Sequence, residues 1–142
     1  MHIESYIKGP TRRTPGIVLS EGRILIMGRS IPENPGDFYT PVINWVNDFT
    51  QIYTGKIRID LGFDYINTCS TKYIFLMLKQ LVETEGIKQN ISVTWYFEQD
   101  DDDMNDLGLI LRSITECPFI LKGTYMIDQG LYEKILLESE RE

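Results

Sequence analysis

The sequence predicts a single α/β domain with a mixed, mostly parallel β-sheet of about five strands, an N-terminal antiparallel hairpin and helices mainly on one face. Apolar and polar residues alternate with a period of two in residues 56–63 and 91–97, as in strands that bury one face. Segments with apolar residues at helical spacing separate these strands. Strands that alternate with helices form a largely parallel sheet through right-handed crossovers. Because the alternation leaves one sheet face more polar, the helices are expected mainly on the other.

The N-terminal segments are assigned from turn residues and short apolar runs. Residues 1–15 contain two prolines and a glycine, and they are predicted to form an arm or an edge segment. Residues 16–19 and 23–28 are apolar runs joined by the turn-prone triplet Ser-Glu-Gly. This pattern predicts a β-hairpin.

The first helix is placed from its apolar stripe. Residues 30–37 are predicted to be irregular, because two prolines and a glycine interrupt them. Thr40 is the predicted N-cap, Pro41 the first helical residue, and Gly55 ends the helix. The stripe that faces the core is Val42, Trp45, Val46, Phe49 and Ile52.

The second half of the chain repeats the alternation of strand and helix. After the strand at 56–63, apolar residues at helical spacing predict a helix from about residue 70 to residue 85. The later elements are a strand at 91–97, a helix begun by Asp102 or Asp103, a strand at 119–121 and a terminal helix at 132–137.

The junction between the strand at 56–63 and the next helix is the most informative segment. Residues 67–71 read Asn-Thr-Cys-Ser-Thr and must contain the start of the helix. The first turn of a helix has unpaired N–H groups and a partial positive charge, so a hydroxyl caps it and a phosphate is tolerated there. From the residues alone, capping is the preferred interpretation of Thr68, and Ser70 and Thr71 are rivals for either role.

Length, charge and composition exclude several classes of protein. The 142 residues fit one domain spanning residues 1–142, and no apolar stretch is long enough for a membrane span. The N-terminus lacks a basic region followed by an apolar one, so no signal peptide is expected. We therefore expect a cytoplasmic protein without membrane contact, with Cys69 and Cys117 reduced. A formal net charge of −7 with scattered basic residues disfavours nucleic acid as a partner.

No group of residues predicts catalysis, a metal or a cofactor. His2 is the only histidine and stands at the terminus, and no arginine follows Cys69 at the spacing of a phosphatase loop. Asp60 and Asp64 could form a metal pair, but without further ligands we interpret them as solvent-facing carboxylates with an electrostatic role. The acidic run at 98–103 is interpreted as a solvated helix start.

Two blocks of sequence resemble the SiaC family of bacterial regulatory phosphoproteins. The first is Gly-Arg-Ile-Leu-Ile-Met-Gly-Arg-Ser-Ile-Pro-Glu-Asn at 22–34, which continues to Val-Ile-Asn-Trp-Val at 42–46. The second is Arg-Ile-Asp-Leu at 58–61 with Tyr-Ile-Asn-Thr-Cys-Ser at 65–70. The resemblance covers roughly residues 22–81. The order of elements is also that of the anti-sigma-factor-antagonist (STAS) fold.

The resemblance implies a partner-switching protein that is not an enzyme. It implies that Thr68 is phosphorylated by a dedicated serine/threonine kinase and dephosphorylated by a PPM-type phosphatase. The unmodified form would bind and activate an effector, most specifically a diguanylate cyclase, and so favour biofilm formation through cyclic di-GMP. The implied partner-binding residues are Ser30, Pro32, Glu33, Asn34, Asn67, Thr68 and Ser70.

Two other functions stay open from the sequence. The same fold would permit an antagonist of the anti-sigma type that sequesters a regulatory kinase. A hydrolase that uses Cys69, Asp60 or Asp64 is the least favoured, because no base, oxyanion donors or metal ligands accompany them. Residues 30–34 also have a purely structural interpretation, as the turn that ends the second strand.

Overall fold

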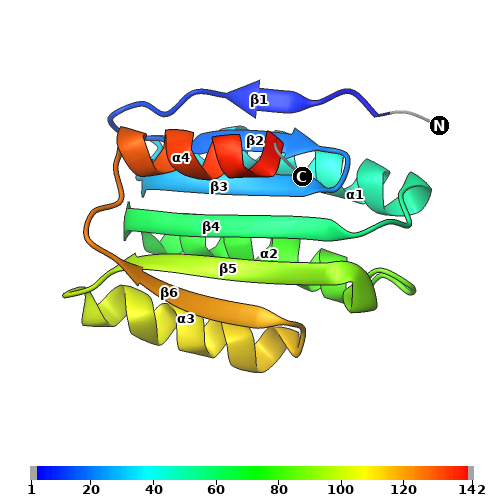
Figure 1. Ribbon diagram of the computed structural model, residues 1–142. Helices are drawn as coiled ribbons and strands as arrows, with labels where there is room; N and C mark the ends of the chain where they lie inside the picture. Colours follow the sequence, from blue (N-terminus) through cyan, green and yellow to red (C-terminus); the bar gives the residue numbers. More distant parts are fainter. Residues whose placement is uncertain (1–2, 141–142) are drawn as a thin grey trace.

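A computed structural model of the chain describes residues 3–140, and His2 lies outside the described residues (Figure 1). Its strands are β1 (Tyr6–Lys8), β2 (Gly16–Ser20), β3 (Arg23–Ser30), β4 (Ile57–Ile66), β5 (Ile91–Glu98) and β6 (Phe119–Thr124). Its helices are α1 (Pro35–Ile52), α2 (Thr68–Glu83), the short 3-10 helix η1 (Lys88–Asn90), α3 (Asp102–Thr115) and α4 (Gln129–Glu140).

The strands form one mixed sheet in which the spatial order follows the order along the chain, from β1 to β6. The pairs β1–β2 and β2–β3 are antiparallel, and the pairs from β3 to β6 are parallel. The predicted fold class is therefore confirmed. The sixth strand is β1, within residues 1–15, where Ile7 pairs with Val18.

Helices cover the two faces of the sheet unequally. Helices α1, α2 and α3 lie behind the sheet in Figure 1, and α4 alone lies in front of it, along β2 and β3. The larger apolar cluster joins the first three helices to the sheet residues that face them, including Ile59, Leu61, Phe63 and Trp95. A smaller cluster lies under α4. The expectation that most helices lie on one face is confirmed.

Helix α1 begins earlier than the sequence predicts. Asn34 is its N-cap, with a side-chain oxygen that accepts a hydrogen bond from the Asp37 N–H at 3.1 Å, and Pro35 is in the first turn. The predicted N-cap at Thr40 is wrong, and Pro41 lies inside the helix. Proline lacks the N–H that the first turn leaves unpaired in any case, so Pro35 opens the helix instead of interrupting the chain.

Three other boundaries also differ from the prediction. Strand β4 continues to Ile66, and α2 begins immediately afterwards at Thr68. By contrast, α3 begins at Asp102 as predicted, with Asp101 as its N-cap. Helix α4 spans Gln129–Glu140 and is longer than the predicted segment at 132–137.

Gly108 gives a test of how tightly α3 packs on the sheet. A Cβ atom there would lie 2.5 Å from Cδ1 of Trp95, whose indole N–H donates to the Met104 carbonyl. Gly108→Ala should therefore destabilise the protein by about 1–3 kcal/mol in urea denaturation, although alanine favours helix. The control is Gly130→Ala in α4, where the nearest atom is 3.4 Å away and stability should not fall. Equal stability of Gly108→Ala and wild type would contradict this packing.

Candidate functional site

The parallel pair of β3 and β4 sets the geometry of the candidate site. Parallel neighbours end at the same edge of a sheet, and Ser30 pairs with Ile66 at the ends of these two strands. The Asn67 N–H then donates to the Ser30 carbonyl at 3.0 Å, which extends the pairing by one more hydrogen bond. As a result, α1 and α2 both begin at this edge of the sheet (Figure 1).

An asparagine caps each of the two helices. The Asn67 side-chain oxygen accepts from the Ser70 N–H at 2.8 Å, as Asn34 does from the third residue after it in α1. Asn67 thus fills the capping role that the sequence left open among residues 67–71. Thr68, which stands at the first position of α2, is free of that role.

The three candidate phosphate acceptors differ in exposure. Thr68 is exposed, and among residues 3–140 its hydroxyl has no hydrogen-bond partner. Ser70 is fully buried, and Thr71 is half-buried with its hydroxyl donating to the Asn67 carbonyl at 3.0 Å. A kinase active site can therefore reach Thr68 without unfolding the helix start, and it cannot reach Ser70 in this way.

Two tyrosines, Tyr39 and Tyr73, connect the starts of α1 and α2 beneath the surface. The Tyr39 hydroxyl of α1 lies 2.5 Å from the Ser30 hydroxyl, and its ring stacks on Tyr73 of α2 with centroids 5.6 Å apart. Burial raises the pKa of Tyr39 to about 12, and the Ser30 and Ser70 hydroxyls partly oppose that rise. The Ser70 hydroxyl lowers the pKa of Tyr39 from nearby. Its Oγ nevertheless makes no hydrogen bond within the described part of the chain.

Neither Tyr39 nor Tyr73 was predicted from the sequence to belong to this site. Tyr39 continues the helical spacing of Val42 and Val46 toward the N-terminus. That spacing was a usable signal, but the prediction that Thr40 caps the helix left Tyr39 outside it.

The predicted partner-binding residues lie at one edge but do not share one surface. Ser30, Pro32 and Ser70 are buried, so their side chains support the backbone. The accessible side chains are those of Glu33, Asn34 and Thr68, with Asn67 half-buried. Glu33 also pairs with Arg13 of the N-terminal arm at 3.0 Å, which ties the arm to this loop.

The acidic run and the two cysteines are further candidates from the sequence. Within the acidic run, the Asp101 side chain caps α3 by accepting from the Met104 N–H at 3.1 Å. Cys69 is exposed beside Thr68, and Cys117 is partly buried, and both are free thiols. Across the residues that the structure describes, no group of three or more His, Cys, Asp or Glu is placed to hold a metal ion. The same residues contain no helix long and apolar enough to cross a membrane.

Comparison with known proteins decides the family. A family model described as SiaC family regulatory phosphoprotein matches residues 9–123, which include both helix starts and Thr68. The chain belongs to the SiaC family. The resemblance seen in the sequence blocks is therefore confirmed.

Relatives of the SiaC family from Pseudomonas aeruginosa match most of the chain. An uncharacterised protein of strain UCBPP-PA14 is 28% identical over 115 residues, which are 80% of this chain and 91% of the relative. The crystal structure of apo-SiaC is 26% identical with a TM-score of 0.77, and the match covers 85% of this chain and 100% of that one. A structure of the diguanylate cyclase SiaD in complex with its activator SiaC matches with the same identity and TM-score, over 84% of this chain and 99% of that one.

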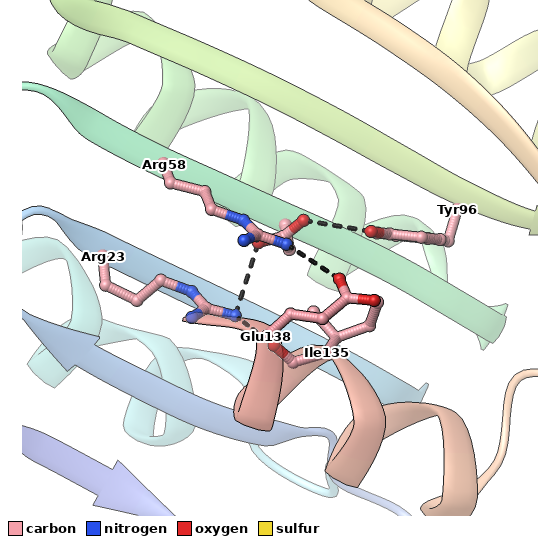
Figure 2. A network of polar contacts seen from close by, with 6 residues as sticks. Arg23, Arg58, Tyr96, Ile135 and Glu138 are labelled. Atoms are coloured by element: carbon pink, nitrogen blue, oxygen red, sulfur yellow. Dashed lines mark hydrogen bonds and ion pairs between the residues drawn. The ribbon is translucent and has the colours of Figure 1, made fainter. Parts of the chain in front are cut away.

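A buried ionic network lies beneath α4 (Figure 2). The SiaC-family match ends at residue 123, before this helix. Asp60 of β4 is fully buried, with Arg58 at 2.8 Å, Arg23 at 3.4 Å and the Tyr96 hydroxyl donating at 3.2 Å. Burial, followed by the negative charge of Asp60, raises the pKa of Tyr96 to about 12.

The interpretation of Asp60 as a solvent-facing carboxylate is wrong. The alternation of β4 correctly placed it on the face away from the main core, but α4 covers that face. Asp64 is closer to the expectation, since its side chain is partly exposed and pairs with Arg29 at 3.0 Å.

The cap of α2 can be tested apart from the phosphate acceptor. Asn67→Ala removes the oxygen that accepts from the Ser70 N–H, so it should lower the free energy of unfolding by about 0.5–2 kcal/mol. Thr68→Ala is the matched control one residue later, and it should change stability by less than about 0.5 kcal/mol. Urea denaturation measures both variants. A larger loss for Thr68→Ala than for Asn67→Ala would reverse the assignment of the cap.

Proposed function

We propose that this chain is a phosphorylation-controlled partner-switch protein whose unmodified form binds and activates a diguanylate cyclase. Membership of a family of regulatory phosphoproteins supports a signalling role. The SiaC chain that resembles this one is described as the activator of the cyclase SiaD, with which it forms a complex. In this proposal the chain acts by binding and has no turnover of its own.

The exposed hydroxyl of Thr68 is the observation that carries the proposal. It stands at the first position of α2, outside the cap and outside the apolar core. A phosphate on Thr68 would lie at the positive end of the helix dipole. The first turn of α2 contains no acidic residue that would repel it. We infer that a serine/threonine kinase and a PPM-type phosphatase act on this hydroxyl, with Glu33, Asn34 and Asn67 beside it on the partner surface.

Electrostatics explains how the phosphate would act as a switch. Phosphorylation adds about −1.5 to −2 charge at neutral pH. Lys72, which is exposed one turn further along α2, is the basic residue nearest to Thr68 along this helix. The helix dipole offsets about 0.3–1 kcal/mol, so the fold survives modification. A charge left desolvated and unpaired in an interface costs about 3–5 kcal/mol, which corresponds to roughly two to three orders of magnitude in affinity.

The proposal predicts that phosphate appears on Thr68 and that it weakens binding to the cyclase. Calorimetric titration of a diguanylate cyclase from the source cell should give about 100- to 1,000-fold weaker binding for the stoichiometrically phosphorylated protein. Thr68→Ala should bind like the unmodified wild type and resist phosphorylation, while Thr68→Glu should bind weakly with an unchanged melting temperature. Production of cyclic di-GMP by the cyclase should follow the same order.

Ser70 and Thr71 provide the controls. Ser70→Ala and Thr71→Ala should still be phosphorylated, with mass spectrometry locating the phosphate on Thr68. Modification at Ser70 or Thr71 alone would refute the site. Equal affinities of the phosphorylated and unmodified forms would refute the mechanism, and binding without any change in cyclase activity would refute activation.

A further inference from the structure

A β-bulge near the end of β4 moves Tyr65 out of the core. Consecutive residues of β3 pair with Phe63 and then with Tyr65, so Asp64 is an extra residue in β4. A bulge of this kind shifts the alternation of side chains by one position. Phe63 and Ile66 therefore both pack into the larger apolar cluster, and Tyr65 between them is 54% exposed. Strict alternation from Phe63 would have buried Tyr65 and exposed Ile66.

Tyr65 and Tyr125 are the two exposed aromatic residues in the part of the chain that the structure describes. Tyr125 directly follows β6 and is 85% exposed, and its neighbour Met126 is 49% exposed. Buried tyrosines use their hydroxyls inside the protein, as Tyr39 does with a serine and Tyr96 with an aspartate. The hydroxyls of Tyr65 and Tyr125 have no such partner within residues 3–140, so both are free to bond to another molecule.

Both exposed tyrosines lie at the edge of the sheet where α2 begins. The parallel strands β3 to β6 all end at this edge, and Figure 1 shows the connection from β6 to α4 running past the ends of β5, β4 and β3. Asp64, which precedes Tyr65, and Ile127, two residues after Tyr125, line the same cavity of about 940 Å³. The segments that carry the two tyrosines therefore border one hollow of the surface.

This edge also carries Thr68. Three steps of the chain separate Tyr65 from Thr68, so their Cα atoms are at most about 11 Å apart. A protein interface of standard size covers about 800 Å² on each partner, which is a patch roughly 30 Å across. A partner that is displaced by phosphate on Thr68 must cover Thr68, and a patch of that size centred near Thr68 also covers Tyr65.

We propose that Tyr65 and Tyr125 are the aromatic anchors through which the chain binds the diguanylate cyclase, and that they insert into apolar pockets on the cyclase beside the surface that covers Thr68. This inference rests on the proposed function, because the cyclase is the partner that the phosphate is to displace. Tyrosine is enriched in protein interfaces and among the residues that dominate binding energy, since it buries a large ring and keeps one hydroxyl for a hydrogen bond.

The anchors supply what the polar residues around Thr68 do not. Glu33, Asn34 and Asn67 offer hydrogen bonds but little apolar area. With affinity supplied by the two tyrosines, Thr68 itself needs to make no favourable contact, and its phosphate acts by keeping the partner away from its neighbours. This explains why Thr68→Ala is expected to retain binding.

Calorimetric titration against the cyclase separates the anchors from the switch. Tyr65→Ala should bind at least about 30-fold more weakly than wild type, and Tyr125→Ala about 5- to 30-fold more weakly. Tyr65→Phe keeps the ring and loses one hydroxyl, so it should lose less than about tenfold. The matched control is Leu137→Ala, which removes a side chain of the same 54% exposure two turns into α4 and should bind like wild type. Melting temperatures check that all four variants stay folded.

Hydroxyl-radical footprinting of the wild type locates the contact without any substitution. Tyr65, Tyr125 and Met126 should be oxidised in the free protein and protected by saturating cyclase. Weak binding of Tyr65→Ala without protection of Tyr65 would overturn the anchor as a direct contact.

The outcomes also separate this inference from the proposed function. Wild-type affinity of both alanine variants, with phosphate on Thr68 still weakening binding, would overturn the anchors and leave the proposed function standing. Failure of the unmodified wild type to bind a diguanylate cyclase from the source cell would overturn both.

Discussion

The parallel pairing of β3 with β4 is the constraint on which the rest of the candidate site depends. Because Ser30 and Ile66 end these strands side by side, α1 and α2 must begin at one edge. Only then can Tyr39 reach Ser30 and stack on Tyr73, and only then does the Asn67 N–H, one residue before Thr68, reach the Ser30 carbonyl. A slip of one residue in this register would turn each β4 side chain to the opposite face and separate these contacts.

The two faces of the sheet are held by different physical means. Behind the sheet, three helices bury a continuous apolar core that contributes most of the stability. In front, α4 buries a smaller patch together with Asp60, Arg23 and Arg58. A buried ion pair adds little net stability, although the loss of one member is costly, so this network fixes where α4 lies more than how firmly it is held.

Periodicity in the sequence was enough to predict the sheet, its mixed pairing and the junction at Asn67 and Thr68. It could not separate the capping role from the exposed hydroxyl, because both belong to residue types that suit a helix start, and only the backbone path assigns the cap to Asn67. Pro35 misled the prediction because proline both ends a strand and opens a helix. The burial of Asp60 depends on α4, which is distant in sequence and whose apolar pattern predicted only a short terminal helix.

The agreement between strand order and chain order has a consequence for synthesis. Each strand from β2 to β6 adds to an edge of the sheet that is already present, so the sheet can grow in the order in which its strands are made. The region from β1 to β6 can assemble progressively as it leaves the ribosome, with Asp60 and its arginines still in water. Helix α4 emerges after all six strands. Until it does, every nascent copy presents an open, partly charged sheet face to the surrounding proteins.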